Sequence, residues 1–187
     1  MFIQTEETPN PATLKFIPGR VVMGEGTAEF RDSDAAGRSP LAQALFGVDG
    51  VAGVFLGQDF LSVSKVADAE WFTLKPAVLA AIMDHFTSGR PVIEASTEAA
   101  AADDAAGGDD DEIVLQIKEL LETRVRPAVA QDGGDIVFHG FEDGVVFLHM
   151  QGSCAGCPSS TATLKAGIEN MLRHYIPEVV EVRAINA

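Results

Sequence analysis

The sequence GSCAGCPSS, residues 152–160, contains both cysteines of this 187-residue chain, Cys154 and Cys157. Residues 145–150, just before it, form an apolar run that is typical of a strand. Apolar residues downstream recur at the spacing of an amphipathic helix, at Leu164, Ile168, Met171, Leu172 and Tyr175. The sequence therefore places both sulfurs in a turn between a strand and a helix, with Pro158 at the first helical position.

The cysteine pair indicates metal or redox chemistry. The start of a helix presents unpaired N–H groups and a positive dipole end, so we expect two partly exposed, easily ionised thiols. One chain offers only two cysteine ligands, whereas structural zinc and iron–sulfur clusters usually take four protein ligands. The simplest completion is a second copy of the chain, related by a two-fold axis. A metal centre that two chains share near the surface should be easy to transfer to another protein, which is the behaviour of a carrier.

Charge and hydrophobicity limit the classes of function. The formal net charge of −15 counts against binding to nucleic acid or to an anionic membrane surface. Apolar residues make up 47% of the chain, enough for folded cores, but no apolar run approaches the ~18 residues that cross a bilayer. Residues 1–5 resemble a strand rather than a secretory signal or a transit peptide, so we expect a cytoplasmic protein of bacterial type or, as the alternative, an already mature form.

Residues 94–111, EASTEAAAADDAAGGDDD, differ in composition from the rest of the chain. They include acidic residues but no basic or aromatic residue. Such a segment cannot bury enough apolar surface to order itself, so it is predicted to be a flexible linker. The alternative is one or two helical turns over residues 97–106, because alanine favours helix. The linker divides the chain into a domain of residues 1–93 and a domain of residues 112–187.

The segments on both sides of the linker predict two small α+β domains. In the first domain the expected elements are strands at 2–4, 14–17, 51–56 and 60–66 and helices at 39–46 and 73–86. In the second, they are a helix at 113–125, strands at 136–141 and 144–150, the helix after the cysteines and a strand at 179–185. The second domain therefore has the order α-β-β-α-β, and Pro127 should kink or end its first helix. Trp71 and Phe72 are expected to cap the first core, and His85 to be a hydrogen-bonded boundary residue.

Several blocks of the sequence resemble a known family. DGGDI at 132–136, the cysteine turn, residues 163–169 and IPEV at 176–179 resemble the C-terminal domain of NifU, also called the Nfu domain. Residues 8–16 and 50–60 resemble the N-terminal domain of two-domain Nfu proteins. Together these blocks extend over almost all of the chain outside the linker.

The resemblance implies a non-enzymatic iron–sulfur cluster carrier. It implies that Cys154 and Cys157 of two subunits hold a [4Fe–4S] cluster, while a [2Fe–2S] cluster stays open as an alternative. It also implies that the loaded form is a homodimer. The expected partners are apo iron–sulfur proteins as recipients and upstream cluster-assembly proteins as donors.

Other interpretations of the cysteine pair remain. A thiol–disulfide oxidoreductase also uses two cysteines at this spacing, but usually with an aromatic residue before them and a proline between them. Here Ala155 and Gly156 lie between them, and the only tryptophan, Trp71, is in the other domain. A zinc ion shared by two chains would use the same four sulfurs. A reducible disulfide or two inert buried thiols is the purely structural interpretation.

Polar residues near the cysteines have plainer interpretations. Asp132 and Asp135 flank two glycines, so a turn is favoured over a metal-binding or acid–base pair. His139 and His149 lie on adjacent predicted strands in an alternation typical of surface positions, and we expect neither to be a ligand.

Overall fold

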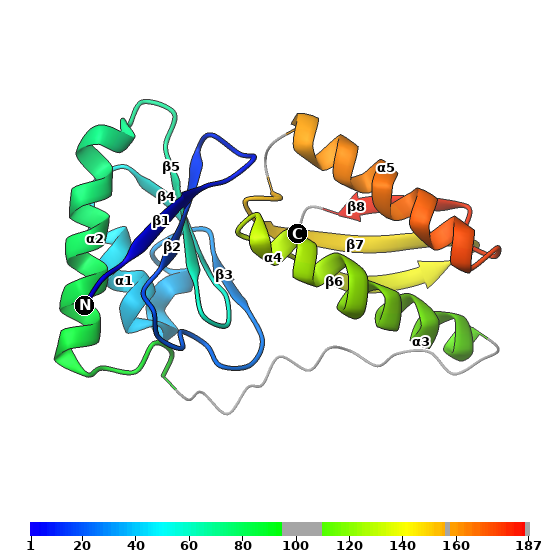
Figure 1. Ribbon diagram of the computed structural model, residues 1–187, viewed down its shortest axis with the longest axis horizontal. Coiled ribbons are helices and arrows are strands. Elements are labelled where there is room, and N and C mark those ends of the chain that lie inside the picture. The colour runs from blue at the N-terminus through cyan, green and yellow to red at the C-terminus, as the bar shows by residue number, and fades with distance from the viewer. Residues whose placement is uncertain (95–109, 156–157, 186–187) are drawn as a thin grey trace. The chain divides into compact units, whose positions relative to one another are not determined.

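The computed structural model describes residues 1–94, 110–155 and 158–185. The chain separates into two compact units, Met1–Ala99 and Ala100–Ala187, which are described one at a time. Both units combine helices with a sheet, which confirms the predicted α+β class (Figure 1). Residues 95–109, which make up most of the predicted linker, lie outside the described residues.

The first unit is an antiparallel sheet with helices on one face (Figure 1). Its strand order is β1-β2-β5-β4-β3. The strands are β1 (Gln4–Glu7), β2 (Thr13–Ile17), β3 (Ala28–Phe30), β4 (Val51–Leu56) and β5 (Leu61–Lys65). The helices are the short 3-10 helix η1 (Ala35–Arg38), α1 (Pro40–Phe46) and α2 (Trp71–Ser88). Apolar side chains of α1 and α2 form one core with those of the sheet.

Most predicted elements of the first unit are present, with shifted ends. Ser39 begins α1 as its sequence predicts, because its hydroxyl accepts the N–H of Ala42 at 3.1 Å. The helix α2 is followed by Gly89 in the left-handed conformation, with φ of 69°. The first strand begins at Gln4 rather than at Phe2, and no sequence pattern indicates the three-residue strand β3.

Two of the predictions for α2 are wrong. Trp71 packs partly buried against the core and donates its Nε1–H to the carbonyl of Pro11 at 3.0 Å, but Phe72 is 92% exposed. His85 is buried, and its Nε2 has no hydrogen-bond partner among the described residues. Burial lowers the pKa of His85, and the positive charge of Arg90 lowers it further.

The second unit has the predicted order α-β-β-α-β. Its helices are α3 (Asp110–Leu120), the π-helical turn η2 (Leu121–Val125), α4 (Arg126–Gln131) and α5 (Pro158–Tyr175). The strand β6 (Gly134–Glu142) pairs antiparallel with β7 (Val145–Gly152), which pairs parallel with β8 (Glu181–Ile185). Asp143 and Gly144 turn the hairpin with φ of 48° and 79°, which suits a two-residue hairpin loop.

The helix that contains Pro127 continues instead of ending. A proline has no N–H to donate, so it interrupts the hydrogen-bond ladder of an α-helix. Here the backbone widens into the π-turn η2, in which the N–H of Arg126 donates to the carbonyl of Leu121. The helix then resumes as α4, which leads directly to the connection before β6.

The core of the second unit lies between its helices and one face of its sheet. Its fully buried members include Ile117, Leu121, Val129, Ile136, Val146, Leu148, Ile168, Leu172 and Val182. The predicted apolar stripe of α5 is largely confirmed, because Leu164, Ile168, Met171 and Leu172 all belong to this core. Tyr175, its last predicted member, is 49% exposed.

Candidate metal centre

The cysteine turn connects β7 to α5. Cys154 lies two residues after the end of β7, and Pro158 is the first residue of α5. The predicted strand–turn–helix arrangement is therefore confirmed. Gly156 and Cys157 lie outside the described residues, so the geometry that follows concerns Cys154 and its surroundings.

The first half of the turn is bonded to the connection between α4 and β6. The N–H of Ser153 donates to the carbonyl of Gly133 at 3.3 Å, and its hydroxyl donates to the carbonyl of Asp132. Gly133 has φ of 80°, a conformation that favours glycine. The sequence Asp132-Gly133-Gly134-Asp135 thus includes a turn, as its composition predicts, and this turn supports the cysteine.

The backbone of Cys154 is held on both sides. Gly152 has φ of 65°, and the N–H of Ala155 donates to its carbonyl at 3.1 Å, which closes a tight turn. The hydroxyl of Thr161 in α5 donates to the carbonyl of Cys154 at 3.0 Å. The position of this cysteine is therefore fixed by hydrogen bonds to two different elements.

The Cys154 sulfur is buried against the start of β6. The residue is 6% exposed and belongs to the hydrophobic core of the second unit. A Cβ atom placed on Gly134 would lie 2.6 Å from the Sγ of Cys154 and 2.8 Å from the carbonyl oxygen of Gln151. Only a glycine at position 134 leaves room for the sulfur where it now lies.

Burial also changes the chemistry of this thiol. It raises the pKa of Cys154 to about 11. A hydrogen bond with Ser153 lowers the pKa, whereas the charges of Asp132 and Asp135 raise it. The prediction of an exposed, easily ionised thiol is therefore wrong for Cys154. That prediction considers only the helix after the cysteines and not the α4–β6 connection, which covers the sulfur.

An ion pair between Arg126 and Asp135 supports this connection. Asp135 is 3% exposed, and Arg126 donates to its two carboxylate oxygens from Nε at 2.9 Å and from Nη2 at 3.0 Å. The N–H of Ile136 donates to the same carboxylate at 2.8 Å. The hydrogen bond to Asp135 and the negative charges of Asp135 and Glu122 raise the pKa of Arg126, although burial of the side chain acts in the opposite direction. Asp135 is thus a structural ion-pair partner, and no sequence pattern singles out Arg126 as the residue that reaches it.

The histidines of the sheet do not form a second metal site. His149 lies opposite Val137 in the β6–β7 register, and His139 lies at the irregularity between Phe138 and Gly140. Within residues 1–94, 110–155 and 158–185, no group of three or more His, Cys, Asp or Glu side chains could hold a metal ion. Among the described residues, His139 and His149 therefore join no such group.

Two sequence families match the two units. Residues 3–89 match the family described as scaffold protein Nfu/NifU N terminal, and residues 117–183 match the NifU-like domain. These ranges include every strand of both sheets except the last two residues of β8.

Curated relatives match over nearly the whole chain. The chain is 55% identical over 186 residues to a protein of Drosophila ananassae named NFU1 iron-sulfur cluster scaffold homolog, mitochondrial. It is 55% identical over 181 residues to NifU-like protein 4, mitochondrial, of Arabidopsis thaliana. The alignments include 99% and 96% of this chain but 64% of each relative, so this chain spans less than two thirds of their length.

Solved structures are similar over about half of the chain. A Staphylococcus aureus protein, SAV1430, is 32% identical with a TM-score of 0.39, over 43% of this chain and 98% of its own. A NifU-like protein of Saccharomyces cerevisiae is 26% identical with a TM-score of 0.47, over 51% of this chain and 87% of its own.

One prediction from the sequence is contradicted by these comparisons. The sequence of residues 1–5 favours a cytoplasmic protein of bacterial type, but the relatives from Drosophila and Arabidopsis are named as mitochondrial. The prediction rests on five residues of a chain that spans only part of its relatives, and that is too little to identify a compartment. None of the helices in the described part of the chain combines the length and apolar character of a membrane span.

Proposed function

Because the chain belongs to the two-domain Nfu/NifU-like family of scaffold proteins, we propose that it binds an iron–sulfur cluster as cargo and delivers it to other proteins. One observation carries this proposal: the whole chain has two cysteines, and both fall in the sequence between the end of β7 and the first residue of α5. Cysteine thiolates are the usual ligands of iron–sulfur clusters, most often four of them. One chain therefore supplies half of a site.

The cargo we propose is a [4Fe–4S] cluster that is shared by two copies of the chain. Cys154 and Cys157 of each copy would be its ligands, and the loaded form would be a homodimer with a two-fold axis through the cluster. The domain limits that we propose are residues 1–93 and 112–187, with residues 94–111 as the linker, whose last two residues already belong to the first turn of α3. Only the second domain contains the ligands, so dimerisation on loading involves that domain.

The surroundings of Cys154 are suited to holding and releasing a ligand. Its backbone is fixed by the hydrogen bonds of Ala155 and Thr161, so binding of iron should cost little conformational entropy at this residue. Its sulfur lies against Gly134, next to the charges of Asp132 and Asp135. Iron must therefore displace a proton from this thiol, so binding of the cargo releases protons and should weaken as the pH falls.

Delivery would proceed by ligand exchange and not by catalysis of a covalent reaction. Thiolates of an apo iron–sulfur protein would replace Cys154 and Cys157 one at a time, and each released sulfur would regain a proton. Upstream cluster-assembly proteins would load the carrier by the same exchange in reverse. The chain acts in this account as a non-enzymatic carrier between donors and recipients.

Anaerobic reconstitution of the parent chain and of single variants tests this function. We expect about two irons and about two sulfides per chain in the parent, which corresponds to one [4Fe–4S] cluster per dimer. Cys154→Ser and Cys157→Ser should keep the circular dichroism of the parent but bind no cluster. Ala155→Ser, which places a hydroxyl in the same turn without removing a sulfur, is the matched control and should load normally.

Three results would contradict the proposal. A full cluster in Cys157→Ser would show that the second cysteine is not a ligand. Uptake of zinc without sulfide would favour a shared zinc site. Cycling of a disulfide between the two cysteines without any uptake of metal would favour a thiol–disulfide oxidoreductase.

A further inference from the structure

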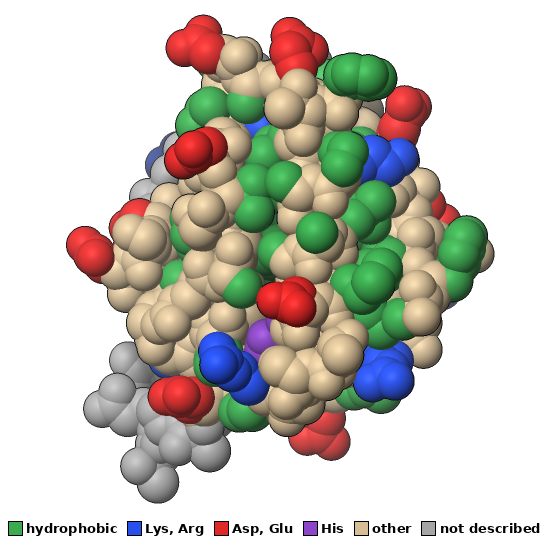
Figure 2. Space-filling view, turned by 90° about the vertical axis from the view of Figure 1, so that its left-hand side faces the viewer, with side chains coloured by type: hydrophobic (Ala, Val, Ile, Leu, Met, Phe, Trp, Pro, Cys, Tyr) green, Lys and Arg blue, Asp and Glu red, His purple; other side chains and the backbone are tan. Residues whose placement is uncertain are grey.

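The outer face of α2 is apolar although it is exposed. On its inner side, Leu74, Val78 and Ile82 are buried in the core of the first unit. On its outer side, Phe72 is 92% and Met83 is 44% exposed. Hydrophobic side chains gather over the middle of this face, and most charged side chains lie toward its rim (Figure 2). A helix that is apolar on both sides normally has packing partners on both sides.

The exposed residues of α2 follow the spacing by which helices pack together. The seam consists of Thr73, Pro76, Ala80, Met83 and Thr87, which are all exposed and are separated alternately by three and four residues. This alternation is the repeat of a helix that packs along another helix. Within the seam, the small side chains of Pro76 and Ala80 allow a close approach, and the larger side chain of Met83 follows them. Phe72 lies beside the seam and is 92% exposed.

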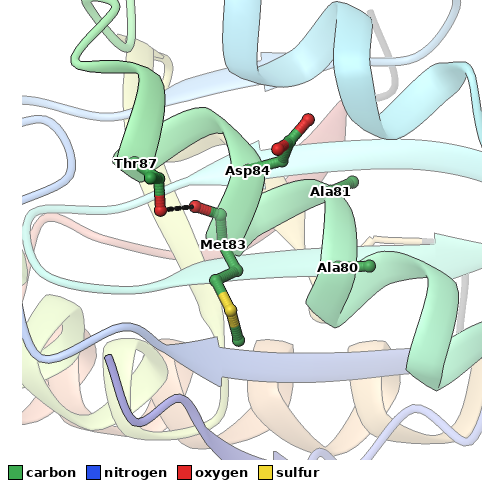
Figure 3. Close-up of a pocket in the computed structure, with 5 residues that line it drawn as sticks. All are labelled: Ala80, Ala81, Met83, Asp84 and Thr87. Carbon is green, nitrogen blue, oxygen red and sulfur yellow. Dashed lines mark hydrogen bonds between the residues drawn. The ribbon is translucent and has the colours of Figure 1, made fainter.

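A hollow on this seam has the shape that receives a side chain from another helix. It is lined by Ala80, Ala81, Met83, Asp84 and Thr87 (Figure 3). Four of these residues stand at positions i, i+3, i+4 and i+7, which form the hole in knobs-into-holes packing. The hydroxyl of Thr87 donates to the carbonyl of Met83 at 2.7 Å, so it is already satisfied within the helix (Figure 3).

We propose that the outer face of α2 docks one amphipathic α-helix of a partner protein, with lysine or arginine beside the partner's apolar stripe. The 18 residues of α2 form a face about 27 Å long and about 10 Å wide. That footprint of about 270 Å² is well below the ~800 Å² that each partner buries in a stable complex. The face therefore suits a single helix that binds weakly, and not a stable dimer of the chain.

Charge determines which kind of helix fits. A second copy of α2 presents the same Asp84 and no lysine or arginine in its seam, so it lacks the basic side chain that would pair with Asp84. Asp84 lines the hollow, whereas the exposed charges just outside the two ends of α2, Glu70 and Arg90, are of opposite sign. Lys75 is the only lysine or arginine of α2 and lies outside the seam. A basic residue on the partner would thus meet Asp84 beside the seam, which favours faster association and a more specific fit.

This docking extends beyond cluster binding, because the first unit contains no cysteine. It can be tested on the full metal-free chain with a synthetic helical peptide of about 18 residues. The peptide has leucines at the alternating spacing and lysines beside them, and a matched peptide has glutamates in place of the lysines. Binding is followed in the methyl NMR signals of the chain's methionines, Met1, Met23, Met83, Met150 and Met171.

We expect the lysine peptide to shift the Met83 methyl signal in a saturable way and to leave the other four unchanged. The glutamate peptide should bind several times more weakly. Ala80→Glu places a charge in the middle of the seam and should weaken binding of the lysine peptide by about tenfold or more. Ala166→Glu is the matched control, because Ala166 is an exposed alanine of α5, and it should leave binding unchanged. Phe72→Ser provides a second variant at an exposed position and should weaken binding as well.

Three outcomes would overturn the proposal. In the first, no peptide moves the Met83 signal. In the second, Ala80→Glu and Ala166→Glu bind the lysine peptide equally well. In the third, the Met83 signal broadens with protein concentration in the absence of peptide, which would identify a second copy as the occupant.

Discussion

Replacing Gly134 by alanine should damage the cysteine site without altering its ligands. The new Cβ would lie 2.6 Å from the Sγ of Cys154, 2.8 Å from the carbonyl oxygen of Gln151 and 3.1 Å from the N of Cys154. Normal contact distances are about 3.5–4.0 Å, so the sulfur has to move by roughly 1 Å. Two of the three atoms belong to the backbone, so the start of β6 and the end of β7 must separate as well. Overpacking of this kind typically costs about 1–3 kcal/mol.

The assay compares Gly134→Ala with Gly140→Ala, which lies on the same strand and whose new Cβ would have no heavy atom within 4 Å. Urea unfolding of the metal-free chains should show a loss of about 1–3 kcal/mol for Gly134→Ala only. After anaerobic reconstitution, its iron content per chain should fall well below that of Gly140→Ala, because the Cys154 sulfur is displaced. Equal stability and equal iron content in the two variants would refute the contact between Gly134 and Cys154 as a determinant of the site.

Three further predictions concern Asp135, Ser153 and the buried His85. Asp135→Asn removes the charge that Arg126 faces. The free energy of unfolding in urea should fall by about 1–3 kcal/mol. A change within experimental error would contradict the structural role of this ion pair. Ser153→Ala removes the hydroxyl that donates to the carbonyl of Asp132, and it should lower the free energy of unfolding in urea by about 1 kcal/mol. An unchanged urea midpoint would mean that this hydrogen bond does not stabilise the fold. Because burial lowers the pKa of His85 in the folded state, the unfolded state binds more protons below about pH 6.5, and stability should decrease as the pH falls through that value. His85→Leu should reduce this decrease between about pH 8 and about pH 5, and an identical pH dependence in both chains would assign it to other groups.

The sequence predicts elements well where one local signal decides them. Ser39 and Pro40 determine the start of α1, and Gly89 determines the end of α2, because each satisfies a backbone requirement within a few residues. The strand β3 is missed because its three residues are too few to show a period. The length of the helix around Pro127 is missed because the π-turn depends on packing and not on local composition.

In the candidate metal centre, too, some features depend on neighbouring residues in the sequence and others on residues far along the chain. The turn that holds the cysteines follows from the glycines, the proline and the apolar runs beside it. The burial of Cys154 cannot be predicted from these neighbouring residues, because Gly134 and Asp135 act on it from a strand about 20 residues earlier in the chain. The exposure of Phe72 is missed for a related reason, since an aromatic residue at a helix start is usually assigned to the core of its own domain.

The mass of the loaded protein decides whether two chains share one cluster, because one chain has only two cysteines and the proposed cluster takes four. Native mass spectrometry of the anaerobically reconstituted protein measures chains and cluster in the same ion. We expect a species of two chains with one cluster, and single chains without a cluster in Cys154→Ser. A single chain that retains a complete cluster would contradict it.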